Sequence, residues 1–248
     1  MDAMEKYLNE LQGILGKIQE QEKANIEKTV DIISEALEGG KLIHIFGTGG
    51  HSAIGAMEVF YRAGGLVPIN PLFPPGISVM DSHPNTERVV GYAKSVLDYY
   101  GVKQDDVIII VNVNGINAVT IDSALESKER GATVIAVTSS EFSKNVPPDI
   151  PARHPSNKDL YELGDIVIDA HVPVGDAVVE IEGLDLKVAP SSTMAICFIL
   201  NSVIALVVER LIQTGVTPPV WKSANMPGGD EANKRYRDEY FDRIRHLY

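Results

Sequence analysis

The chain of 248 residues contains only one cysteine, Cys197, and one tryptophan. A single cysteine excludes an intramolecular disulfide and a cysteine metal cluster, so we expect a reducing compartment, the cytoplasm. Positive charge is also scarce, because 22 Lys and Arg face 34 Asp and Glu and the formal net charge is -12. We therefore expect neither nucleic acid nor an anionic membrane as a partner, and any bound phosphate must depend on a local site.

Long apolar runs are absent as well. The most apolar segment, residues 194–208, includes Asn201 and Ser202 and is too short to span a bilayer, so we predict a buried helix over residues 191–214. The acidic N-terminus does not resemble a signal peptide. Since 44% of the residues are hydrophobic and 23% are charged, the composition is typical of a globular protein. We expect residues 1–248 to form one domain.

The spacing of apolar residues predicts an α/β fold. Apolar residues between Met4 and Leu37 recur every three or four positions, which indicates an amphipathic N-terminal helix over residues 1–38. Runs rich in Val and Ile, without polar alternation, are typical of a parallel sheet covered on both faces. The sequence thus predicts a three-layer sandwich with a C-terminal helical extension over residues 215–248, a charged helix at 230–246 and five strands, at 41–46, 66–69, 107–111, 133–137 and 165–169.

A glycine-rich loop follows the first predicted strand. Backbone N–H groups at such a strand-to-helix junction suit an anion, and Ser52 is expected to cap a helix reaching about residue 63. The alternative is a tight turn that uses glycine only for its backbone freedom. A dinucleotide fingerprint would need a third glycine at Ser52, and no Gly-Lys-Ser or Gly-Lys-Thr triplet is present, so we expect neither NAD nor ATP and no cofactor. The candidate binding residues are Gly47, Thr48, Gly49, Gly50, His51 and Ser52.

A second loop places three amides around one glycine after the strand at 107–111. Each amide can donate and accept a hydrogen bond, as sugar hydroxyl groups require. The alternative is a plain turn with a helix N-cap. This loop and two other strand or helix ends add the candidate binding residues Asn112, Asn114, Gly115, Asn117, Thr138, Ser139, Ser191, Ser192 and Thr193.

Several of these segments together resemble the SIS (sugar isomerase) domain family. The resemblance lies in Gly47-Thr48-Gly49, in residues 58–66, in the strand 106–111 with its Asn-Gly loop, and in residues 153–156, 175–177, 191–193, 218–220 and 223–225. It covers nearly the whole chain and is strongest to bacterial single-domain proteins described as phosphosugar-binding or phosphoheptose-isomerase-like. It implies a flavodoxin-like, five-stranded parallel sheet, a homodimer or homotetramer with sites near subunit interfaces, and phosphate held by serine- and threonine-rich loops.

The chain departs from that family in both loops. Asn112 and Asn114 stand where the family commonly has the serines of Ser-x-Ser-Gly, and His51 stands where a serine is usual. Asparagine is bulkier than serine and carries a carbonyl oxygen that repels phosphate oxygens. The sequence therefore leaves open whether the bound sugar is phosphorylated.

Sugar isomerisation needs a base that removes a proton next to a carbonyl and a group that moves protons between oxygens. Glu58, which matches an acidic position of the family branch, and Glu87 are the candidate bases, and His83 and His154 are the candidate proton carriers. Glu58 has the alternative role of a surface or interface carboxylate, and Glu87 that of a capping residue. No set of His, Asp and Glu shows metal-ligand spacing, so we expect no metal.

The resulting prediction is a sugar phosphate binding protein, with aldose-ketose phosphosugar isomerase as the leading activity. Two alternatives stay open. A phosphosugar lyase or etherase would begin with the same proton abstraction, and a non-catalytic sugar sensor would need the pocket without the base. The apolar helix at 191–214 is expected in the core or at a homodimer interface.

Overall fold

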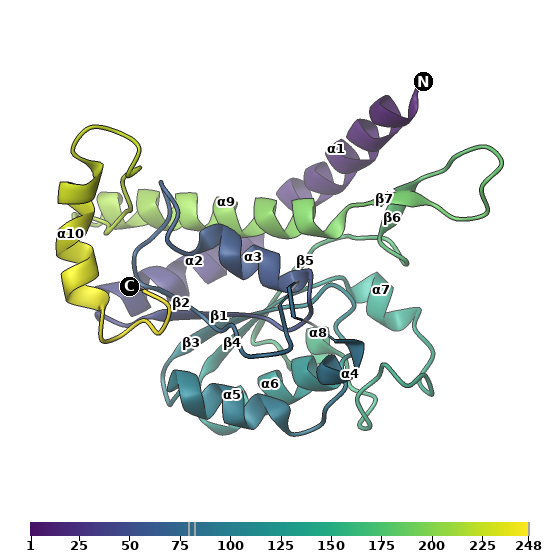
Figure 1. Cartoon of the computed structure of the whole chain (residues 1–248), viewed down its shortest axis with the longest axis horizontal. Coiled ribbons are helices and arrows are strands. Elements are labelled where there is room, and N and C mark those ends of the chain that lie inside the picture. Colours follow the sequence, from purple (N-terminus) through teal and green to yellow (C-terminus); the bar gives the residue numbers. More distant parts are fainter. Residues whose placement is uncertain (79, 82, 248) are drawn as a thin grey trace.

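The centre of the protein is a five-stranded parallel sheet with the strand order β2-β1-β3-β4-β5 (Figure 1). The structure is a computed structural model that describes residues 1–78, 80–81 and 83–247. Its sheet strands are β1 (Ile43–Gly47), β2 (Ile69–Pro71), β3 (Val107–Val111), β4 (Thr133–Thr138) and β5 (Ile166–Asp169). The predicted parallel sheet is confirmed.

Helices cover both faces of the sheet, as predicted (Figure 1). One face carries α2 (Lys23–Glu38), α3 (Ser52–Val59) and α9 (Ser192–Gln213), and the other carries α5 (Tyr92–Tyr100), α6 (Ala118–Glu129) and α8 (Leu160–Leu163). In β3, Ile109 packs into the first apolar core and Ile108 into the second. Both sides of the strand are therefore buried, which explains why its sequence shows no polar alternation.

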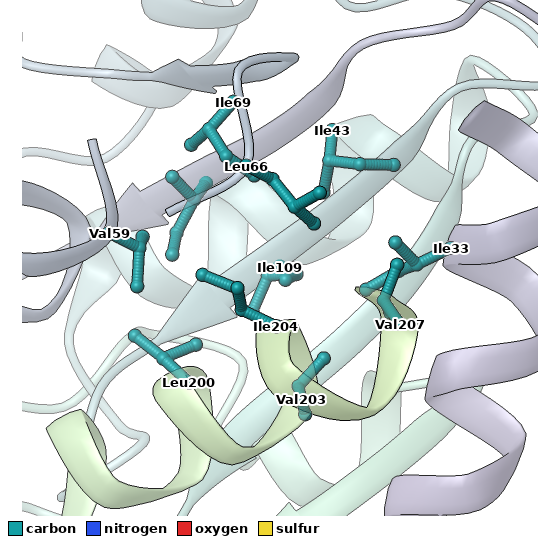
Figure 2. A pocket seen from close by; sticks show the side chains of 11 residues that line it. Ile33, Ile43, Val59, Leu66, Ile69, Ile109, Leu200, Val203, Ile204 and Val207 are labelled. Atoms are coloured by element: carbon teal, nitrogen blue, oxygen red, sulfur yellow. The ribbon is translucent and has the colours of Figure 1, made fainter. Parts of the chain in front are cut away.

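The long helix α9 lies across the sheet and beside α2 and α3. Its length and composition would allow it to cross a membrane, yet its inner side is buried here. A small void of about 20 Å³ lies between this helix and the sheet. Figure 2 shows the apolar side chains that line it, among them Leu200, Val203 and Val207. The predicted burial of residues 191–214 is confirmed for one side of the helix, whereas Leu206 and Ile212 on the other side are exposed.

Three predicted boundaries are wrong. The expected helix over residues 1–38 consists of α1 (Ala3–Gln21) and α2, because Glu22 leaves helical geometry and its buried carboxylate lies 3.1 Å from Nε2 of His171. Helix α3 ends at Val59 rather than near residue 63, since Phe60 is extended. The C-terminal helix α10 (Gly229–Tyr240) is shorter than the predicted 230–246.

The second strand and a short hairpin also differ from the prediction. Strand β2 begins at Ile69, while Leu66, expected in this strand, forms an antiparallel bridge with Val220. The sequence did not predict the antiparallel hairpin of β6 (Ala177–Val179) and β7 (Val188–Pro190), which projects beside α1 (Figure 1). The remaining short helices are α4 (Pro84–Glu87) and α7 (Ser140–Lys144).

Three buried polar side chains, Asn70, His44 and Asp106, contact one another at the opposite end of the sheet from the loops that follow the strands. Asn70 donates to Nδ1 of His44, which leaves Nε2–H of His44 facing the Asp106 carboxylate at 3.4 Å. Burial raises the pKa of Asp106, but hydrogen bonds from His44 and the Lys103 N–H outweigh it and hold the pKa below its usual value. Because the folded-state pKa is lowered, the stabilisation is present above pH about 4 and is lost as the pH falls through the folded-state value.

We therefore predict that Asp106→Asn lowers the free energy of unfolding at pH 7 by on the order of 1 kcal/mol. The difference from the unmodified protein should shrink as the pH falls below about 4. Urea unfolding at several pH values measures both. The exposed neighbour Asp105 provides the control, and an equal loss in Asp105→Asn would contradict this interpretation.

The packing of α9 leads to a second prediction. Leu200 is 2% exposed and borders the void, so Leu200→Ala should cost about 2 to 5 kcal/mol of stability. Leu206, on the same helix, is 38% exposed, and Leu206→Ala should cost less than about 1 kcal/mol. Urea unfolding of the two variants compares them directly. Equal losses would show that the inner side of α9 is not the side that stabilises the fold.

Candidate functional site

The strand order of the sheet reverses at one point, between β1 and β3. Strands β1 and β3 are neighbours, but the helix after β1 lies on one face of the sheet and the helix after β3 on the other. Ligands of such sheets bind at this point, outside the carboxyl ends of the strands. A cavity of about 190 Å³ lies here, lined by Gly49, Gly50, His51, Ser52, Glu87, Asn112, Val113, Asn114, Phe142, Asp176 and Ser192.

The first loop turns so closely that its first residue must be glycine. A Cβ on Gly47 would lie 2.2 Å from the carbonyl oxygen of Ser52. Thr48 is buried, with its hydroxyl 2.7 Å from that of Thr120, and therefore holds the loop instead of facing the cavity. Helix α3 begins at Ser52 with His51 as the N-cap, so the predicted capping role of Ser52 is wrong.

Glu87 of α4 closes over this loop. Its Oε1 accepts a hydrogen bond of 2.9 Å from the Gly50 N–H, so a residue far along the chain reaches the first loop. The N–H groups of His51 and Ser52, and the Ser52 hydroxyl, have no hydrogen-bond partner within residues 1–78, 80–81 and 83–247. These three donors lie at the N-terminus of α3, where the helix dipole favours an anion.

The two asparagines of the second loop direct their carbonyl oxygens into the loop itself. Oδ1 of Asn112 accepts from the Gly115 N–H at 2.9 Å, and Oδ1 of Asn114 accepts from the Ile116 N–H at 3.2 Å. An N–H donor fixes which end of the amide is the oxygen, so both NH₂ groups point away from these contacts. Gly115 has φ of 62°, and a Cβ there would lie 2.6 Å from Oγ1 of Thr138. Because the side-chain carbonyl oxygens of Asn112 and Asn114 accept hydrogen bonds within their own loop, they do not oppose an anion in the cavity.

A carboxylate occupies the N-terminus of α9. Oδ1 of Asp176 accepts from the N–H groups of Ser191 and Ser192 at 2.9 and 2.7 Å, and Oδ2 accepts from the Ser192 hydroxyl at 2.6 Å. Asp176 precedes β6 and has φ of 66°. No local signal in the sequence indicates this contact, because Asp176 lies 15 residues before Ser191, the N-cap of α9.

Of the four candidate catalytic residues, only Glu87 lines the cavity. Glu58 is on α3 and contacts Arg62 at 3.3 Å and Asn201 at 3.4 Å. His83 is exposed and caps α4 by accepting from the Asn85 N–H. His154 is buried and lies 3.1 Å from Asp122. The structure therefore places Glu58, His83 and His154 outside the cavity.

The predicted binding residues divide in the same way. Seven of them line the cavity, namely Gly49, Gly50, His51, Ser52, Asn112, Asn114 and Ser192. Others support the loops from behind: Asn117 donates to Ala152, and Val172 donates to Ser139. Gly47, Thr48, Gly115, Thr138, Ser191 and Thr193 also lie outside the lining. Sequence reasoning missed Val113, Phe142 and Asp176.

Within the described residues, no group of three or more His, Cys, Asp and Glu comes together in a way that could hold a metal ion. The cavity lining also contains no Lys or Arg. Its polar character comes from two carboxylates, two amides, one histidine and the hydroxyls of Ser52 and Ser192, with Phe142 as the aromatic wall.

The fold and the cavity define an α/β ligand-binding protein. The SIS domain model matches residues 6–139, and a UPF0309 protein of Geobacillus thermodenitrificans is 38% identical over 97% of this chain and 96% of its own length. The chain belongs to the SIS domain family, and its sequence relatives include UPF0309 proteins.

Several solved structures share this fold. Phosphoheptose isomerase GmhA from Neisseria gonorrhoeae has a TM-score of 0.56 and 13% identity, over 82% of this chain and 95% of its own. Vibrio vulnificus NanR, complexed with ManNAc-6P, has a TM-score of 0.51 and 12% identity, over 99% of this chain and 71% of its own. At this level of identity, both likenesses show the fold alone.

The close approach of Gly47 to the Ser52 backbone can be tested by adding one methyl group at residue 47. We predict that Gly47→Ala disrupts the junction of β1 and α3 and costs several kcal/mol, about 2 or more, because the clash is with backbone atoms. A Cβ on Gly13, in helix α1, meets nothing within 4 Å, and Gly13→Ala should stabilise by about 0.5 to 1 kcal/mol. Thermal unfolding of both variants checks this, and an undisturbed Gly47→Ala protein would refute the loop geometry.

Proposed function

We propose that the cavity at the β1/β3 switch point binds a sugar phosphate and that the protein is an aldose-ketose isomerase. The observation that carries the proposal is the convergence on one cavity of donors that have no partner among the described residues. The N–H groups of His51 and Ser52 and the Ser52 hydroxyl lie at the N-terminus of α3, and the NH₂ groups of Asn112 and Asn114 lie on the next loop. Such a set suits phosphate oxygens without a cationic side chain.

The rest of the lining suits the carbon chain of the sugar. Carboxylates accept hydrogen bonds from sugar hydroxyl groups, and Asp176 and Glu87 provide them on two sides of the cavity. Phe142 offers an apolar surface for the C–H faces of the sugar. The likeness to N. gonorrhoeae GmhA, a phosphoheptose isomerase, and to V. vulnificus NanR, solved in complex with ManNAc-6P, supports the same ligand class.

Glu87 is the proposed base. It is the candidate carboxylate that lines the cavity, and its Oε1 is held beside the first loop by the Gly50 N–H. Glu87 would take the proton from the carbon next to the sugar carbonyl, forming an enediol, and return it to the neighbouring carbon. His51, which lines the same cavity, would carry the proton between the two oxygens. His51 replaces His83 and His154 in this role because of its position.

A non-catalytic sugar sensor is the second candidate function. The observation that favours it is the position of Glu58, His83 and His154, all of which lie outside the cavity. A lyase or etherase would share the proton abstraction by Glu87 and differ in the bond that breaks next. Product analysis separates these two from an isomerase.

Three further features stay predictions. We expect a homodimer or homotetramer, because Met4 and Leu8 of α1 and Met194 of α9 are large apolar side chains at least half exposed. We also keep the expectation that the protein acts in the cytoplasm and that residues 1–248 form one domain.

Thermal unfolding with pairs of phosphorylated and unphosphorylated sugars tests ligand binding. A ligand at about 100 times its dissociation constant stabilises the fold by roughly 2.7 kcal/mol, and each kcal/mol raises the midpoint by about 2 to 4 °C in a chain of this size. Stabilisation by phosphorylated sugars alone is the expected result. Stabilisation only by the unphosphorylated partners, or by neither, would contradict the proposal.

The catalytic role is tested with Glu87→Gln. We predict that this variant still binds the stabilising sugar phosphate but loses at least about 100-fold in turnover, as expected on removing a general base. Deuterium incorporation next to the carbonyl in D₂O, followed by NMR, reports the proton abstraction itself. Glu58→Gln is the matched control and should keep full activity, since Glu58 faces Arg62 and Asn201. Loss of exchange in Glu58→Gln with full exchange in Glu87→Gln would assign the base to Glu58.

A further inference from the structure

The cavity contains two helix N-termini, and they differ in one respect. At α3, the N–H groups of His51 and Ser52 have no acceptor within the described residues. At α9, the N–H groups of Ser191 and Ser192 both donate to Asp176. Since a helix N-terminus attracts negative charge, the carboxylate at α9 takes the place that a ligand anion would otherwise occupy.

We infer that Asp176 is a specificity-determining residue, which excludes phosphate from the α9 end of the cavity and accepts a hydroxyl or ammonium group of the sugar there. This inference rests on the proposed function, because it assigns an orientation to the same ligand. The phosphate lies at the α3 end, and the neutral or cationic end of the sugar faces Asp176. The expected substrate class is a sugar monophosphate, and sugar bisphosphates are rejected.

The geometry of Asp176 supports a fixed carboxylate instead of a mobile one. Three hydrogen bonds from Ser191 and Ser192, between 2.6 and 2.9 Å, hold both of its oxygens. Asp176 lies directly before β6, and its backbone φ of 66° is a value that residues other than glycine seldom adopt. A second negative group beside Asp176 would meet like charge without any Lys or Arg in the lining to offset it.

The test removes the charge with two substitutions that this backbone tolerates. Both asparagine and glycine adopt positive φ readily, so Asp176→Asn and Asp176→Gly are expected to keep the fold. Asp169 is the matched control: its carboxylate accepts from the N–H and hydroxyl of Ser140 at the start of α7, yet it does not line the cavity. Circular dichroism establishes that each variant is folded.

Inorganic phosphate is the first probe, measured by isothermal titration calorimetry. We predict that Asp176→Asn and Asp176→Gly bind phosphate at least about tenfold more tightly than the unmodified protein, because both remove the like charge and Asp176→Gly also frees the N–H and hydroxyl of Ser192 for charge-assisted hydrogen bonds. Asp169→Asn should show no change. If either folded Asp176 variant binds phosphate no more tightly than the unmodified protein does, the inference is wrong.

The second probe needs no variant. The unmodified protein should bind a hexose 6-phosphate at least about tenfold more tightly than the matching hexose 1,6-bisphosphate. Tighter binding of the bisphosphate would overturn the inference even if the Asp176 variants failed to fold. If the unmodified protein bound no sugar phosphate but the Asp176 variants gained phosphate binding, the proposed function would fail while the role of Asp176 would stand.

Discussion

The pairing of β1 with β3 is the constraint on which the rest of the structure depends. These neighbours run parallel, with Ile43 opposite Val107 and Gly47 opposite Val111, and so end at the same level. Because their following helices lie on opposite faces of the sheet, the two loops separate and leave a space between them. Glu87, Phe142 and Asp176 then line this space from elsewhere in the chain. The cavity is thus a consequence of strand order, and its chemistry depends on the side chains that line it.

The side chains that line the cavity are unusual for a phosphate site, because they include two carboxylates and no Lys or Arg. The apparent conflict is resolved by position. The Asp176 carboxylate is bound to the N-terminus of α9, whereas donors at the N-terminus of α3 have no partner within the described part of the chain. The asparagine carbonyl oxygens are engaged within their own loop. Glu87 also brings a carboxylate to the first loop, through the Gly50 N–H, but it leaves the N–H groups of His51 and Ser52 without an acceptor in the described part of the chain. This difference between the two helix N-termini gives the cavity a direction, and a sugar with one phosphate has the same asymmetry.

Much of the fold was predictable because β1, β3 and β4 are buried on both faces. Such strands are rich in Val and Ile and show no polar alternation, so they can be recognised in the sequence. The position of the glycine loop was predictable for the same reason, since it follows a recognisable strand. Contacts between distant segments were not predictable. Nothing near Glu87 indicates that it reaches Gly50, and Asp176 caps a helix from across a hairpin. The family pattern indicates Glu58 as a base, but α3 turns it toward Arg62 and α9.

The central claim is that the ligand binds at the carboxyl ends of β1 and β3. Hydrogen-deuterium exchange followed by mass spectrometry, with and without the sugar phosphate that gives the largest thermal stabilisation, tests it most directly. We expect the ligand to slow exchange in the loops at residues 47–52 and 112–117, because the backbone N–H groups of His51 and Ser52 would gain an acceptor. Protection confined to other segments, such as the groove lined by Phe73, Tyr99 and His246, would contradict it.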